Sequence, residues 1–266
     1  MAISHQGAAY LGQRKAAAVN ITRYYIFGFW GPRRETPEAL ACRFNRLIDR
    51  LALIDSAFSN WFWFGGKKPP VSFASIRNQL AAQIAMAVIR GDDGEPEPIS
   101  GYRFGLLNSL EDTPRLLDLS VHAGSWYISQ SIYSNTIDLG TDWPLPPDPA
   151  IVTYRIFKPA LLALAETFET AFCAAFPNDL MKFWLLEQKF RPGWINYVAP
   201  RFAPLVTPPR SAIVEYRPDG GLLMSATDET FVTSNPQHLA VARDIETALA
   251  PLNALPWPPD AERDQA

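Results

Sequence analysis

The chain has 266 residues, a formal net charge of −3 and a hydrophobic content of 48%. This balance is typical of a globular protein and excludes a disordered or collagen-like chain. The small negative charge argues against nucleic acid as the main partner, because nucleic-acid-binding domains usually carry a strongly basic face.

The sequence carries no signal for a membrane or for export. No stretch approaches the roughly 18 consecutive apolar residues of a transmembrane helix. Residues 1–20 lack the apolar core of a signal peptide. We therefore expect a cytoplasmic protein with no membrane partner. The two cysteines, Cys42 and Cys173, are far apart and each lies in a predicted helix, so they do not indicate a disulfide framework.

The first half of the chain is predicted to alternate strands and helices. Residues 21–30 are aromatic and β-branched, which favours a strand. Thr36, Pro37 and Glu38 then form the start signal of an amphipathic helix over 37–54. Further elements are predicted at 60–65 (strand), 72–90 (helix) and 102–107, 116–122 and 134–139 (strands).

The second half follows a stiff proline-rich connector at 143–149. A strand at 151–157 is expected, then a helix over 159–176, because phenylalanines recur there at four-residue spacing. A hairpin is predicted at 212–226 around an Asp-Gly-Gly turn. A last helix is predicted to begin near residue 234.

These elements indicate an α+β fold, with a mixed, largely antiparallel sheet and about four amphipathic helices packed on it. We expect one globular domain over residues 21–255, with a flexible arm at 1–20 and a flexible tail at 256–266. The similar order of elements in the two halves suggests two similar lobes, 21–143 and 150–255.

One pattern favours catalysis. Asp179 is followed by Glu187 and Lys189, and many restriction-type nucleases use two carboxylates on Mg²⁺ with a lysine beside the attacking water. Charged residues are common at such spacing, so a solvated charged surface explains the same residues. No pair of His or Cys residues has zinc-ligand spacing. We therefore predict that the protein has no metal site and no cofactor and is not an enzyme.

Aromatic and acidic residues offer a protein-binding surface instead. Tryptophan and tyrosine dominate the binding energy of many interfaces, although a sheet buried on both faces also explains a high tryptophan count. Carboxylates around such anchors would attract a basic partner. The candidate partner-binding residues are Asp92, Asp93, Glu95, Glu97, Trp126, Tyr127, Asp138, Asp142, Trp143, Trp194 and Tyr197.

Three aromatic segments carry a resemblance to a known family: 29–32 (Phe-Trp-Gly-Pro), 61–65 (Trp-Phe-Trp-Phe-Gly) and 193–197 (Gly-Trp-Ile-Asn-Tyr). Together with the closing hairpin and helix, they make the chain similar, over roughly residues 20–252, to the immunity protein 52 family of bacterial polymorphic-toxin systems. The resemblance implies a stoichiometric inhibitor of a cognate secreted nuclease toxin. That toxin would have a restriction-endonuclease-like domain and would fit a type VI secretion effector.

The resemblance brings no catalytic residues and no mapped binding surface. Three interpretations therefore stay open at this point. The first is an immunity protein that does not itself contact nucleic acid. The second is a magnesium-dependent nuclease or hydrolase that uses Asp179, Glu187 and Lys189. The third is a module that binds a ligand, such as a sugar, on its aromatic surfaces.

Overall fold

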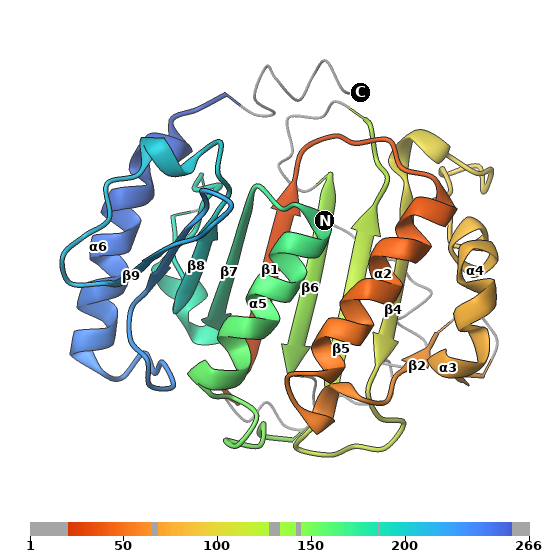
Figure 1. The fold of residues 1–266 in the computed structure, drawn as a ribbon, viewed down its shortest axis with the longest axis horizontal. Coiled ribbons are helices and arrows are strands. Elements are labelled where there is room, and N and C mark those ends of the chain that lie inside the picture. The colour runs from red at the N-terminus through yellow and green to blue at the C-terminus, as the bar shows by residue number, and fades with distance from the viewer. Residues whose placement is uncertain (1–20, 65–68, 128–133, 142–144, 186, 257–266) are drawn as a thin grey trace.

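The computed structural model describes residues 21–64, 69–127, 134–141, 145–185 and 187–256. These residues form an α+β fold around a ten-stranded sheet with the strand order β3-β2-β4-β5-β6-β1-β7-β8-β10-β9 (Figure 1). All pairings between these strands are antiparallel. The strands are β1 (Tyr24–Trp30), β2 (Phe62–Trp63), β3 (Val71–Ser72), β4 (Tyr102–Leu107), β5 (Leu117–Ala123), β6 (Asn135–Thr141), β7 (Phe172–Pro177), β8 (Ile195–Val198), β9 (Ile213–Tyr216) and β10 (Leu222–Ser225).

Helices α2 and α5 cross one face of this sheet side by side, as Figure 1 shows. The predicted α+β class, with a largely antiparallel sheet, is therefore confirmed. The helices are α2 (Pro37–Ala52), α3 (Phe73–Ile76), α4 (Leu80–Met86), α5 (Tyr154–Phe168) and α6 (Pro236–Asn253).

The first strand of the chain lies in the middle of the sheet. β1 pairs with β6 from the first half of the chain and with β7 from the second half. On the face toward the helices, Trp30 packs against Phe168 of α5, with ring centroids 5.3 Å apart. One sheet and one core therefore run through both halves.

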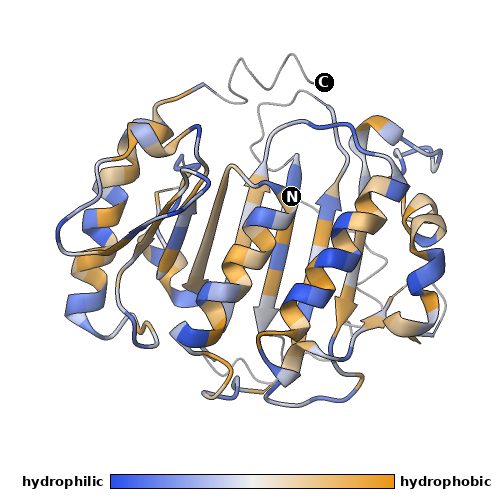
Figure 2. Cartoon of the chain, viewed as in Figure 1, coloured by the Kyte–Doolittle hydropathy of each residue, from blue (hydrophilic) through white to orange (hydrophobic). Residues whose placement is uncertain are grey.

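The amphipathic helix predicted at 37–54 forms as α2. The Thr36 side chain accepts a hydrogen bond from the Ala39 backbone N–H at 3.3 Å, which satisfies one free donor at the helix start. Figure 2 shows hydrophilic and hydrophobic residues alternating along α2, whereas α5 is hydrophobic over most of its length. α2 therefore exposes one side to solvent, and α5 is buried on nearly all sides.

The strand predicted at 151–157 is wrong, and the helix predicted at 159–176 forms with different bounds. The helix begins earlier, at Tyr154, with Pro159 inside it, and ends at Phe168. Residues 172–177 then form strand β7, and all six of them are buried. A strand covered on both faces loses the alternation of polar and apolar residues, so its phenylalanines imitated a helical period.

The helix predicted at 72–90 is shorter and interrupted. It divides into α3 and α4, which are separated by a 3₁₀ turn at Arg77–Gln79. The backbone of Gln79 leaves the α conformation, with φ −115° and ψ 12°, and this breaks the helical register. Cys42 is exposed and Cys173 is buried in β7, and both are free thiols.

Within the described parts of the chain, no helix combines the length and the hydropathy that crossing a membrane requires.

Candidate partner-binding surface

A loop between α4 and β4 carries the run of acidic residues. Its two sides are held together as in a hairpin: the Glu97 N–H donates to the Ile89 carbonyl at 2.7 Å, and the Ile89 N–H donates to the Gly101 carbonyl at 2.9 Å. We call residues 90–97 the acidic arm. It lies at the upper right of Figure 1, in yellow. This backbone pairing gives the arm a defined direction away from the sheet.

The carboxylates of the acidic arm are all on exposed residues. Within the arm, the Asp93 carboxylate accepts a hydrogen bond from the Glu95 N–H at 3.0 Å, and Arg90 donates to the Gly94 carbonyl at 2.9 Å. Those contacts order the turn but leave the acids on the surface. The exposed acids are Asp92, Asp93, Glu95 and Glu97.

Two aromatic residues lie beside the base of the arm. The backbone N–H of Trp126 donates to the Ile99 carbonyl at 3.1 Å, and the Arg34 guanidinium lies 5.0 Å from the centre of the Trp126 ring. Tyr127 is 54% exposed. We call the group formed by Asp92, Asp93, Glu95, Glu97, Trp126 and Tyr127 the acidic–aromatic edge. Six of the predicted partner-binding residues thus gather in one place.

His122 fixes the base of the arm to the sheet. Its Nε2 lies 2.8 Å from the Ser100 carbonyl, which requires a proton on that nitrogen. Burial lowers the pKa of His122, the hydrogen bond to Ser100 opposes that shift, and the charge of Arg103 adds to it. A neutral imidazole with its proton on Nε2 therefore holds this end of the loop. A histidine at the end of a predicted strand gave no sign of this role.

Asp138 lies elsewhere, in the middle of β6. Its register partners are Phe27 on β1 and Ser120 on β5, so it belongs to the sheet face turned away from α2 and α5. Its Oδ1 atom is inaccessible and has no hydrogen-bond donor among the residues that the structure describes. Burial raises the pKa of Asp138 to about 7.

Two other predicted residues lie in the core. The Trp194 ring is fully buried 5.6 Å from the Phe157 ring, and its indole N–H donates to the Thr227 carbonyl at 3.0 Å. Tyr197 is buried, and its hydroxyl donates to Asp219 at 3.2 Å. Both side chains stabilise the fold and present no surface to a partner. Asp142 and Trp143 lie outside the described residues.

Two of the three residues of the nuclease interpretation form hydrogen bonds within the fold. Asp179 accepts a hydrogen bond from the Thr233 hydroxyl at 2.6 Å, and the Lys189 ammonium donates to the Leu255 carbonyl at 2.7 Å. Glu187 is exposed. In the described part of the chain, no three His, Cys, Asp or Glu side chains come together as metal ligands.

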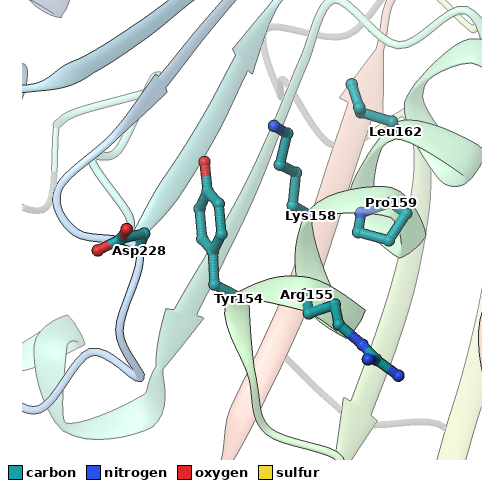
Figure 3. A pocket seen from close by; sticks show the side chains of 6 residues that line it. All are labelled: Tyr154, Arg155, Lys158, Pro159, Leu162 and Asp228. Carbon is teal, nitrogen blue, oxygen red and sulfur yellow. The ribbon is translucent and has the colours of Figure 1, made fainter.

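An open pocket of about 510 Å³ lies beside the first turns of α5 (Figure 3). The Lys158 ammonium forms an ion pair with Glu215, and the Tyr154 hydroxyl lies 3.2 Å from the Ser225 hydroxyl. Figure 3 shows Arg155 pointing away from Tyr154, so the basic groups do not converge. None of its lining residues was a predicted site residue. The lining residues are Tyr154, Arg155, Lys158, Pro159, Leu162 and Asp228.

Comparisons with known proteins give one clear match. The family model of immunity protein 52 matches residues 22–254. No curated protein matches the chain. Among four matching chains of solved structures is the T6SS protein PA0821 of Pseudomonas aeruginosa, which is 12% identical, with a TM-score of 0.48. The match covers 86% of this chain and 73% of that one. A TM-score of this size supports no inference about function.

Proposed function

The chain belongs to the immunity protein 52 family, and from this membership we propose that it binds and neutralises a cognate secreted nuclease toxin. It would act in the cytoplasm as a stoichiometric inhibitor without catalysis. The observation that carries the proposal is the family match over residues 22–254. A type VI secretion effector with a restriction-endonuclease-like domain is the toxin class that we propose.

The acidic–aromatic edge supplies a physical basis for such binding. A nuclease needs a basic groove for its substrate, and exposed carboxylates accelerate encounter with a basic surface. The four acidic residues of the arm are exposed, and the Arg90 guanidinium donates a hydrogen bond to the Gly94 carbonyl within the loop. We propose that the arm approaches the substrate groove of the toxin and excludes DNA from it.

The aromatic part of the edge would hold the complex together. Trp126 is stacked under Arg34, and Tyr127 projects into solvent beside it. Tryptophan, tyrosine and arginine are the residue types that most often dominate binding energy, and differences in affinity arise mainly from the dissociation rate. The acids would therefore set the rate of association, and the aromatic pair the lifetime of the complex.

A calorimetric titration tests the proposal. The titrant is this protein, and the cell contains the nuclease domain encoded beside its gene, with its metal-binding carboxylates replaced so that it is inactive. We expect saturable binding of one protein per toxin with a Kd near the nanomolar range, about −12 kcal/mol. Replacement of both Trp126 and Tyr127 by alanine should weaken binding about tenfold or more.

Absence of binding between two folded proteins would contradict the proposal for that toxin. A magnesium-dependent nuclease assay of this protein alone, with Glu187→Gln as its control, addresses the enzyme interpretation. Activity that Glu187→Gln abolishes would replace the immunity proposal with a catalytic one.

A further inference from the structure

The strand order ends at β9, whose outer side is an unprotected sheet edge. β9 pairs with β10, and among the described residues no strand pairs with its other side. Edge strands leave backbone N–H and C=O groups unpaired, and proteins usually protect them with lysine, proline or a bulge. Residues 213–216, Ile-Val-Glu-Tyr, include no such protection and favour a strand. Ile213 is 38% exposed and Tyr216 is 77% exposed.

The register of the β9–β10 hairpin shows which backbone groups face outward. The Arg217 N–H donates to the Gly221 carbonyl at 2.8 Å, so these two residues form a hydrogen-bonded pair. Bonded and non-bonded pairs alternate along an antiparallel ladder. Glu215 is therefore also bonded to β10, whereas Val214 and Tyr216 turn their N–H and C=O groups away from it. We call these outward groups of Val214 and Tyr216 the β9 edge. Within the described residues, they have no hydrogen-bond partner.

The side chains along this strand alternate in direction and in charge. Glu215 and Arg217 lie on the face toward α5, where Glu215 forms an ion pair with Lys158 and Arg217 contacts Glu166 at 3.1 Å. Tyr216 lies between them and points to the opposite face, because successive side chains of a strand alternate. The strand therefore presents an acid and a base, two residues apart, on the same face.

We propose that the β9 edge pairs with the β9 edge of a second copy of this chain, antiparallel and about a twofold axis at Tyr216. The N–H of Tyr216 in each copy donates to the Tyr216 carbonyl of the other. The two sheets then join into one sheet that passes through both copies. This inference goes beyond the proposed function and does not depend on it.

Charge complementarity selects this register and this partner. With Tyr216 opposite Tyr216, Glu215 of each copy lies opposite Arg217 of the other, and such opposite charges stabilise a strand pair. A register centred on Glu215 places two carboxylates opposite each other, which is destabilising. A register centred on Val214 places Glu215 opposite Ile213 and pairs no charges. The edge is thus complementary to itself, and a twofold contact of this kind closes after two copies.

This pairing leaves the acidic–aromatic edge free. The acidic arm stands beside β4, near one end of the strand order, and β9 is at the other end. A dimer formed through β9 therefore carries two separate acidic–aromatic edges, and dimerisation does not compete with a partner that binds there.

Sedimentation equilibrium of the full chain tests the pairing. We expect a monomer–dimer equilibrium for the wild type, with a Kd in the micromolar range. Glu215→Arg places two arginines opposite each other in the dimer, and Arg217→Glu places two glutamates opposite each other. Each variant alone should dimerise about tenfold more weakly or worse. An equimolar mixture of the two variants makes both cross-strand pairs complementary again. It should form a heterodimer with a Kd within about threefold of the wild type.

A second pair of variants tests the backbone contact. Tyr216→Pro removes the outward N–H, and proline is accepted on an edge strand where that N–H faces solvent. Tyr216→Thr also removes the ring but keeps the N–H and favours a strand. We expect Tyr216→Pro to raise the dimer Kd about tenfold or more, and Tyr216→Thr to raise it about threefold or less. Circular dichroism establishes that each variant is folded, and the charge variants decide the question if Tyr216→Pro is not.

Three results would overturn the inference. The first is a wild-type chain that stays monomeric up to about 100 µM. The second is a dimer that folded Tyr216→Pro leaves intact, or a mixture of the two folded charge variants that does not associate. The third is a monomeric wild type whose affinity for the toxin falls in Tyr216→Pro, because the edge would then pair with a strand of the toxin. The first two results leave the proposed function standing, since toxin binding is measured separately.

Discussion

At the residue scale, Asp138 makes the stability of the fold depend on pH. Burial raises its pKa from an ordinary value of 3.8 to about 7, so the folded state holds the proton more tightly than the unfolded state does. The stability that protonated Asp138 contributes is fully present below the pKa of this residue in the unfolded chain. It is lost as the pH rises through the pKa of Asp138 in the folded chain. The nearby groups are Tyr25, whose pKa is raised chiefly by burial, together with Asp118 and Arg23.

We expect Asp138→Asn to gain stability relative to the wild type as the pH rises. Asparagine stays neutral, so the variant avoids the cost of burying a charge at pH 8 but gains nothing near pH 4. Thermal unfolding of both proteins between about pH 4 and pH 8 measures the difference. Glu187→Gln, at an exposed position, is the control and should show no such trend. A Tm difference that is constant across this range would show that Asp138 ionises normally.

Trp194 is the residue whose role the sequence could not decide. Tryptophan often dominates the binding energy of protein interfaces, which suggests a binding residue. The Trp194 side chain is instead fully buried among Tyr24, Tyr154 and Phe157. We expect Trp194→Ala to lower the free energy of unfolding by about 3–5 kcal/mol through the cavity it leaves. Urea unfolding measures this. Toxin binding by the fraction that remains folded should be unchanged, and a specific loss of affinity there would return Trp194 to the interface.

The acidic arm shows what a local pattern can predict. Its acids follow one another in a segment rich in Gly and Pro, so their exposure could be expected from residues 91–98 alone. Their proximity to Trp126 could not, because it arises from the pairing of β4 with β5. The role of Asp138 also depends on register, since a shift of one residue would place it on the helix-covered face.

At the element scale, the region around α5 and β7 shows where periodicity fails. α2 was predicted well because its polar side faces solvent and its cap is local in sequence. β7 lies between β1 and β8 and is buried throughout, so no polar residues mark its faces. The helix ends where Glu169 adopts the left-handed conformation with φ 54°, and glutamate gives no warning of such a turn.

An ion network fastens the end of α5 to the loop before α2. Glu35 is nearly inaccessible and contacts Arg43 at 2.8 Å and Arg33 at 3.2 Å, and both arginines also contact Glu169 at 3.0 Å. The arginines in addition donate to the last carbonyls of α5 at 2.8 and 2.9 Å. They therefore cap the helix as well as pair with the acids.

We expect Glu35→Gln to destabilise the fold by about 1–3 kcal/mol, because two neighbouring guanidinium groups would lose their buried counter-charge. Chemical unfolding at two salt concentrations measures the effect, which should shrink at high salt as repulsion between the arginines is screened. Glu38→Gln removes an exposed acid three residues away and serves as the control. Equal small effects of the two variants would show that the network contributes little.

At the scale of the whole molecule, one sheet passes through both predicted lobes. Its centre is β1, which pairs with β6 before it in the order and with β7 after it. The acidic arm stands near one end of this order, beside β4, and the β9–β10 hairpin is at the other. The chain thus presents its charges to a partner at fixed and widely separated positions, which makes their separate contributions measurable.

The last prediction uses that separation. Reversing two charges of the acidic arm, Asp92→Lys with Asp93→Lys, should slow association with the toxin about tenfold at low salt. The effect should shrink at about 0.5 M salt, because salt then screens the attraction between the arm and a basic surface that is more than a few ångströms away. Stopped-flow association rates measure it.

The matched control reverses two adjacent exposed acids in the loop after β10, Asp228→Lys with Glu229→Lys. Both double variants change the net charge equally, so steering by total charge alone would slow association equally in the two. A larger effect in the acidic arm requires the toxin to approach that edge. Equal effects would show that the arm is not at the interface.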